Sequence, residues 1–167
     1  LVERMADAVQ QMLENAGMTL EQCEGIGIGS PGTIDAKQGV ILYSNNFGWE
    51  NVPIVEELKK HLDTRIEIAN DADAAALGEV CAGAAEGAEN AVLLTLGTGV
   101  GGGVILDKKI FRGAMPGGCE LGHLSIRYDG IRCTCGRKGC LEAYASASAL
   151  LRIAREKAAE HPESIMN

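Results

Sequence analysis

Three cysteines lie close together in the segment Cys-Thr-Cys-Gly-Arg-Lys-Gly-Cys, at positions 133, 135 and 140, and His123 precedes the first of them. Three thiolates and one imidazole complete the tetrahedral shell that Zn²⁺ adopts in structural sites. Four protein ligands leave no position open for a water molecule. The spacing therefore predicts a structural Zn²⁺ ion held by His123, Cys133, Cys135 and Cys140.

The same cysteines could instead belong to a disulfide framework, as in many small secreted domains. The sequence shows neither a secretory signal nor an apolar stretch long enough to span a membrane. The other cysteines, Cys23, Cys81 and Cys119, are scattered among glycine, alanine and apolar residues. We therefore expect one metal cluster, three thiols outside it, a cytoplasmic protein and no membrane partner.

A glycine-rich segment over 97–103 satisfies the pattern G-x-G-x-x-G at Gly97, Gly99 and Gly102. Taken alone, this pattern suggests a dinucleotide site, but such a site needs a helix directly after the glycines. Here the apolar run Val-Ile-Leu at 104–106 follows, and it reads as a strand. The arrangement is therefore predicted to be strand, loop and strand.

A glycine hairpin can still bind phosphate, because its backbone N–H groups can converge on an anion. The hydroxyls of Thr95 and Thr98 would add two further donors. The alternative is that the glycines serve only the backbone angles of a tight hairpin. The density of glycine favours contact with phosphate.

Asp71 follows a predicted strand, at the position where a crevice opens in an α/β sheet. The same residue could simply cap the helix predicted to begin near residue 72. Asn70 or Asp73 could fill that capping role as well. The residues alone leave both interpretations of Asp71 open.

Apolar periodicity predicts the elements that must position these groups. Helices are expected over 2–16, after an Asn51-Pro53 cap and first turn, over 72–83 and over 142–160; strands are expected over 25–29, 40–43, 65–69, 91–96, 104–106 and 110–111. Alternating strands and helices before residue 90 predict an α/β sheet, and the hairpin from residue 91 predicts a second subdomain.

Composition narrows the range of functions. The hydrophobic content of 46% suffices for one compact domain or two small ones. The net charge of −8 argues against a nucleic-acid partner, because such surfaces need clustered positive charge.

The order of these motifs resembles the ROK family of sugar kinases, repressors and related proteins, and within it the ATP-dependent glucokinases. The resemblance is carried by GIGIGSPGTID at 25–35, NDADAAALGE at 70–79, TLGTGVGGG at 95–103, ELGH at 120–123 and CTCGRKGCLE at 133–142. It implies an actin-like or hexokinase-like ATPase fold, built from ribonuclease H-like subdomains and present in part. Residues 1–89 would be the remainder of an N-terminal α/β subdomain with the catalytic Asp. Residues 90–167 would start a C-terminal subdomain with the phosphate hairpin and the zinc and sugar motif.

The resemblance also implies roles for single residues. Asp71 would accept the proton of the attacking hydroxyl. The hexose would be bound by Gly32, Asn70, Asp71, Glu120, His123 and Glu142. Mg²⁺-ATP would be bound by Thr95, Gly97, Thr98, Gly99, Gly101 and Gly102. Alternatively, Glu142 could be only a favourable charge at a helix start, and His123 only a metal ligand.

The resemblance implies phosphoryl transfer from ATP to the 6-hydroxyl of glucose, a reaction of class EC 2.7.1. This reaction belongs to glycolysis and carbohydrate metabolism. The resemblance also implies that the full-length protein is a homodimer. The chain lacks the family's first phosphate loop, an Asp-x-Gly-Gly-Thr element, and the segment on the adenosine side. We therefore expect these 167 residues to be inactive alone. The alternatives are the sugar-sensing domain of a ROK transcriptional repressor, or a kinase for another hexose such as N-acetylglucosamine or N-acetylmannosamine.

Overall fold

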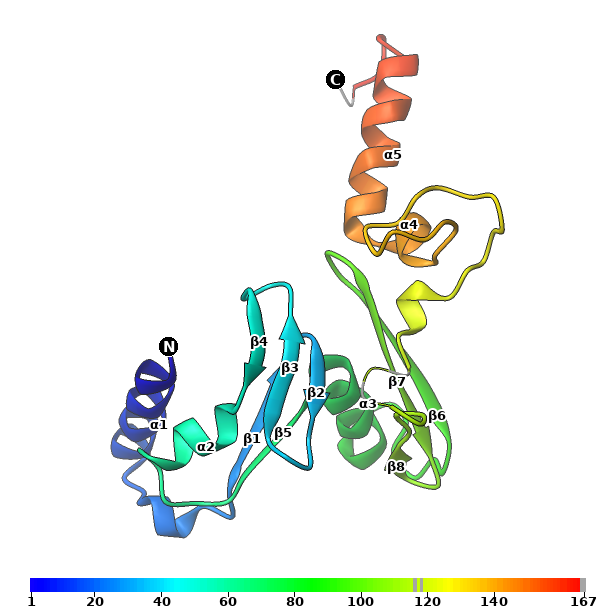
Figure 1. Cartoon of the computed structure of the whole chain (residues 1–167). Coiled ribbons are helices and arrows are strands. Elements are labelled where there is room, and N and C mark those ends of the chain that lie inside the picture. The colour runs from blue at the N-terminus through cyan, green and yellow to red at the C-terminus, as the bar shows by residue number, and fades with distance from the viewer. Residues whose placement is uncertain (116, 118, 166–167) are drawn as a thin grey trace. The chain divides into compact units, whose positions relative to one another are not determined.

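The computed structural model describes residues 1–115, 117 and 119–165, and it divides into two compact units (Figure 1). Unit 1 comprises Leu1–Ala74 and Arg112–Gly117, and unit 2 comprises Ala75–Phe111 and Gly118–Asn167. The division falls inside helix α3 (Asp71–Ala82). The subdomain limits of 1–89 and 90–167 stay a prediction.

Unit 1 contains a parallel strand pair and an antiparallel sheet. Its elements before α3 are α1 (Val2–Ala16), η1 (Leu20–Gln22), β1 (Ile26–Ser30), β2 (Thr33–Asp35), β3 (Val40–Ser44), β4 (Trp49–Val52), α2 (Ile54–Lys59) and β5 (Ile66–Asn70). Strand β1 runs parallel to β5, so that Ser30 lies opposite Asn70 where both strands end. Strands β2, β3 and β4 form the antiparallel sheet.

The core of unit 1 explains why these segments fold as they do. Apolar side chains recur at helical spacing in α1 and α2 and at alternate positions in the strands, which places them on one face of each element. Ile41, Ile54 and Leu58 are buried in this core, and Met5 and Val9 of α1 pack against it. Among the described residues, no helix is both long and apolar enough to cross a membrane.

Unit 2 is built on a three-stranded antiparallel sheet in the order β6, β7, β8. Its elements after α3 are β6 (Ala91–Leu96), β7 (Val100–Leu106), β8 (Lys109–Ile110), η2 (Leu121–His123), α4 (Glu142–Ala145) and α5 (Ala147–Glu160). The core beneath the sheet is formed by Ala76 and Val80 of α3 and by Ile105 of β7.

Three expectations need correction. Asn51 does not open a helix, because it lies within β4, which pairs with β3, and α2 begins only at Ile54. The helix expected over 142–160 is interrupted at Ser146, whose backbone is extended and whose hydroxyl accepts a hydrogen bond from Ala149 N, so that α5 starts anew. The glycine loop is shorter than expected, because β7 already begins at Val100.

Candidate functional site

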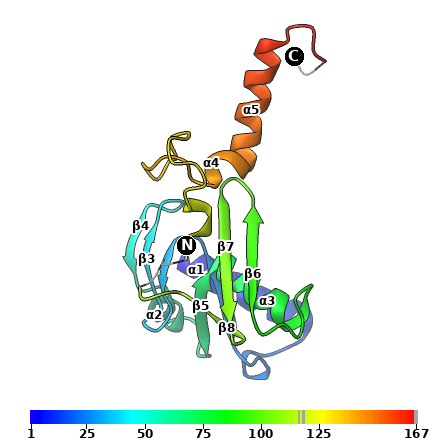
Figure 2. The same cartoon turned by 90° about the vertical axis from the view of Figure 1, so that its right-hand side faces the viewer.

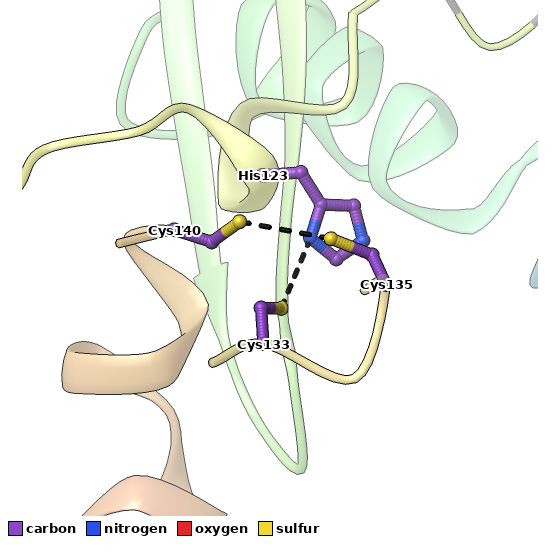
Figure 3. Close-up of side chains that lie close together, drawn as sticks. All are labelled: His123, Cys133, Cys135 and Cys140. Carbon is purple, nitrogen blue, oxygen red and sulfur yellow. Dashed lines mark hydrogen bonds between the residues drawn. The ribbon is translucent and has the colours of Figure 1, made fainter. Parts of the chain in front are cut away.

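The four residues predicted to bind metal converge in unit 2 (Figure 3). Their candidate ligand atoms all lie within 4.8 Å of one another. The Nδ1 atom of His123 is 3.7 Å from Cys133 Sγ, and Cys135 Sγ is 3.7 Å from Cys140 Sγ. Bonds of about 2.3 Å from a tetrahedral zinc ion would place its sulfur ligands about 3.8 Å apart. The donor set and its spacing therefore fit Zn²⁺, whereas a disulfide needs sulfurs about 2 Å apart.

Short turns deliver the ligands to this cluster. Cys133 begins a tight turn and Cys135 lies within it; Gly136, at φ 90°, ends the turn and donates its N–H to the Cys133 carbonyl. Cys140 pairs with Ser125 in an isolated bridge, and His123 ends η2. The glycines of the motif are therefore needed to fold the ligand loop.

The thiols differ in acidity. A hydrogen bond from the Arg137 backbone N–H lowers the pKa of Cys135 to about 6, whereas burial raises the pKa of Cys140 to about 11. Cys135 would thus be ionised at neutral pH, while Cys140 would lose its proton on binding a metal.

Glu142 joins the cysteine segment to the glycine hairpin. Its Oε2 atom accepts a hydrogen bond from Val100 N at 3.0 Å, and its Oε1 atom accepts one from Thr134 Oγ1 at 3.4 Å. Cys133 Sγ lies 3.6 Å from the same Oε1. The carboxylate is half-buried, and its two oxygens offer about four acceptor positions, so it could also bind a sugar hydroxyl.

The hairpin glycines are not explained by their backbone angles. The φ angle is not positive at Gly97, Gly99 or Gly102. The alternative that these glycines serve only the backbone angles of a tight hairpin is therefore wrong for them. At two of these positions only glycine leaves enough space for a neighbouring side chain. A Cβ atom on Gly99 would lie 2.4 Å from Glu142 Oε2, and one on Gly102 would lie 2.7 Å from Leu121 Cδ1. Gly97 instead faces open space and leaves room for a ligand.

The threonines and Gly101 of the predicted nucleotide site lie on the same hairpin. Thr95 is in β6, opposite Gly101 of β7, and Thr98 is exposed at the tip. Glu120 directly precedes η2 and is exposed.

Asn70, Gly32 and Asp71 lie together in unit 1, at the edge where β1 and β5 end. Asn70 Oδ1 accepts hydrogen bonds from Ala72 N at 2.9 Å and Asp73 N at 3.2 Å, so Asn70 caps α3. Its Nδ2 donates to the Gly32 carbonyl at 3.1 Å. Asp71 is exposed and accepts one bond, from Ala72 N, so capping does not require it.

Gly32 has no substitute in this turn. Its φ is 112°, and a Cβ atom there would lie 2.2 Å from the Tyr43 carbonyl oxygen. The turn over Ser30, Pro31 and Gly32 is thus fixed beside Asn70 by both space and backbone angle.

Sequence reasoning missed one ion pair near Asp71. Arg112 Nε lies 3.2 Å from Asp73 Oδ2, and Asp73 is buried. Burial raises the pKa of Asp73, although Arg112 opposes this. From the sequence, Asp73 is only a candidate helix cap, because no local pattern links it to a residue 39 positions away.

Comparisons with known proteins agree with this arrangement. The ROK family matches residues 1–166. The sequence is 40% identical to a glucokinase of Thermotoga maritima over 99% of this chain and 51% of that protein. The structure of a ROK family glucokinase from Streptomyces griseus in complex with glucose and AMPPNP matches with a TM-score of 0.77 and 36% identity, over 96% of this chain and 51% of that one. A ROK family transcriptional regulator, a homolog of the E. coli MLC protein, matches with a TM-score of 0.84 and 28% identity, over 96% and 40% of the two chains.

The mixed α/β fold is therefore that of ROK hexokinase-like sugar kinase structures. The chain belongs to the ROK family. It spans about half the length of the curated relatives that it matches.

Proposed function

We propose that the protein is an ATP-dependent glucokinase that transfers the γ-phosphoryl group of Mg²⁺-ATP to the 6-hydroxyl of glucose. The observation that carries this proposal is the state of Asp71, which is exposed at a strand end while Asn70 caps the following helix. A carboxylate that is not needed as the cap can accept the proton of a sugar hydroxyl. The similarity to glucokinases over nearly the whole chain supports the same conclusion.

Under this proposal, Gly32, Asn70 and Asp71 of unit 1 take part in binding the hexose. Glu120, His123 and Glu142 of unit 2 also offer groups that can bind hexose hydroxyls. The glycine hairpin binds ATP phosphates through its backbone N–H groups, with Thr95 and Thr98 adding hydroxyls. The complex with glucose and AMPPNP in the Streptomyces griseus relative supports both substrates.

His123, Cys133, Cys135 and Cys140 would hold a structural Zn²⁺, which supplies rigidity rather than reactivity. Because His123 turns Nδ1 toward the sulfurs, its Nε2 is the atom available to a sugar hydroxyl. A cytoplasmic location and a homodimer stay predictions.

The test is the change Asp71→Asn in a protein that carries this segment and has the full length of the relatives. Loss of the proton acceptor should lower kcat about 10²–10⁴-fold, while the Kd for glucose changes less than about tenfold because the amide keeps the same shape. Asp63→Asn, an exposed residue of the same unit, is the control and should keep the parental rate. A variant at residue 71 with more than about a tenth of the parental rate would show that Asp71 is not the base.

The same assay, ADP release, addresses the substrate and the fragment. A panel of glucose, N-acetylglucosamine and N-acetylmannosamine identifies the hexose. The 167 residues alone should not turn over, because one phosphate loop without its opposite cannot hold the γ-phosphoryl in line.

The second candidate is the sugar-sensing domain of a ROK repressor. The likeness to a ROK transcriptional regulator favours it. Glucose binding without any ATP turnover in the full-length protein would support the repressor instead.

A further inference from the structure

The tip of the β6–β7 hairpin is anchored to the start of helix α5 (Figure 2). The Ala147 backbone N–H donates to the Gly97 carbonyl at 2.8 Å. The Ser148 hydroxyl donates to the Thr98 carbonyl, also at 2.8 Å. Two successive carbonyls of the turn are therefore directed at the same helix. Both contacts lie within unit 2.

These carbonyls determine where the neighbouring N–H groups face. In a trans peptide, the C=O of one residue and the N–H of the next point in opposite directions. Both peptides of the turn are trans. Since the carbonyls of Gly97 and Thr98 face α5, the N–H groups of Thr98 and Gly99 face away from it. Neither N–H donates a hydrogen bond within the described part of the chain.

We infer that Ser148 is a positioning residue, which holds the turn so that the N–H groups of Thr98 and Gly99 are presented together to the phosphates of the nucleotide. This role rests on the proposed function, and it deepens it by naming the two donors and the side chain that orients them. Two adjacent N–H groups on one side of a turn form a small anion-binding surface. The open space around Gly97 leaves room for the anion beside them.

A purely structural role in α5 does not explain the Ser148 contact. The start of a helix needs hydrogen-bond acceptors for its unpaired N–H groups, and Ser146 Oγ supplies one to Ala149 N. The Ser148 hydroxyl instead donates to the Thr98 carbonyl, and among the described residues no helix N–H donates to it. Water could satisfy the exposed Thr98 carbonyl equally well. What the bond adds is therefore the orientation of the 98–99 peptide.

The experiment is a titration of the ¹⁵N-labelled chain with sodium tripolyphosphate and Mg²⁺, followed by NMR of the backbone amides. In the parent, the amides of Thr98 and Gly99 should shift more than that of Gly97, whose N–H is engaged by the Gly99 carbonyl at 3.0 Å. Ser148→Ala should weaken tripolyphosphate binding about three- to tenfold, the usual effect of losing one neutral hydrogen bond. Ser148→Thr keeps the hydroxyl and should restore most of the affinity.

The matched control is Ser125→Ala. It removes another serine hydroxyl that donates to a backbone carbonyl in unit 2, that of Lys138 at 3.2 Å, and it should leave tripolyphosphate affinity within about twofold. The inference is overturned if the Thr98 and Gly99 amides do not move, or if Ser148→Ala binds as tightly as the parent. Because this titration needs no sugar and no turnover, its failure is distinct from failure of the glucose-dependent ADP release that tests the kinase.

Discussion

Replacing Arg112 with alanine should destabilise unit 1, because it leaves the buried carboxylate of Asp73 without its counter-charge. The Arg112 side chain is 37% exposed and that of Asp73 only 11% exposed. Removing one partner of a fully buried pair costs about 3–5 kcal/mol, whereas exposed pairs contribute about 0.2–1 kcal/mol. Since solvent still reaches Arg112, we expect the free energy of unfolding to fall by about 1–2 kcal/mol at pH 7.

The loss of stability in the Arg112 variant should depend on pH, and the direction of this dependence follows from the pKa of Asp73. Burial raises the pKa of Asp73 above that of an unfolded chain, so between the two values the folded state binds more protons. The contribution of Asp73 to stability therefore falls as pH rises through that window. Without Arg112 the pKa of Asp73 rises further, which widens the window. The difference between variant and parent should thus be smaller near pH 4 than at pH 7.

Urea-induced unfolding followed by Trp49 fluorescence measures this effect. Trp49 is the only tryptophan in the sequence, and it packs against the core of unit 1. The control is Arg65→Ala, which breaks the ion pair between Arg65 and Glu67. The side chains of these two residues are 74% and 63% exposed, so the free energy of unfolding should fall by less than about 0.5 kcal/mol at both pH 4 and pH 7. An equal loss at both pH values in the Arg112 variant would refute the role assigned to the Asp73 charge.

Two further perturbations test unit 2. Elemental analysis of protein never exposed to a chelator should find one zinc ion per chain. The Cys135→Ser variant should lose this ion, whereas the control Cys81→Ser, which lies outside the cluster, should keep it. Parent protein without any metal would contradict the predicted site. Gly122→Ala would place a Cβ atom 1.8 Å from the Val100 carbonyl oxygen, so it should cost at least about 1–3 kcal/mol in thermal unfolding followed by circular dichroism. Gly78→Ala is the control, because a Cβ atom there meets no described atom within 4 Å beyond its chain neighbours and the backbone of its own helix, and alanine favours a helix. Equal effects of the two changes would refute the packing argument.

The elements that local pattern alone determines were predicted well. Helix α1 and strand β6 have the predicted bounds, because apolar residues recur at helical spacing in the first and form one continuous apolar run in the second. His123 and the three cysteines lie close together, as their spacing in the sequence predicts, and whether they bind a metal stays a prediction. The identity of the metal stays a prediction.

Features that depend on distant contacts were not predictable. Strand β4 exists because it pairs with β3, and no strong apolar alternation marks it in the sequence. The sequence predicts that the glycines at 99 and 102 contact a phosphate or form a tight turn. In the folded chain they also leave space for the side chains of Glu142 and Leu121, which no local pattern indicates. The same reason hid the partnership of Asp73 with Arg112.

Glu142 links the predicted metal site to the glycine hairpin, so a structural metal ion could influence the hairpin without contacting the nucleotide. One oxygen of its carboxylate lies beside Cys133 and Thr134, and the other holds the Val100 N–H, the first of strand β7. Helix α5, which follows after Ser146, holds the Gly97 and Thr98 carbonyls at the tip of the same hairpin. A displacement of the cysteine loop would therefore move the carboxylate, and through it the base of the glycine turn. A structural ion at His123 and the three cysteines would stabilise the proposed sugar contact of His123 directly, and the proposed phosphate hairpin through the Glu142 carboxylate.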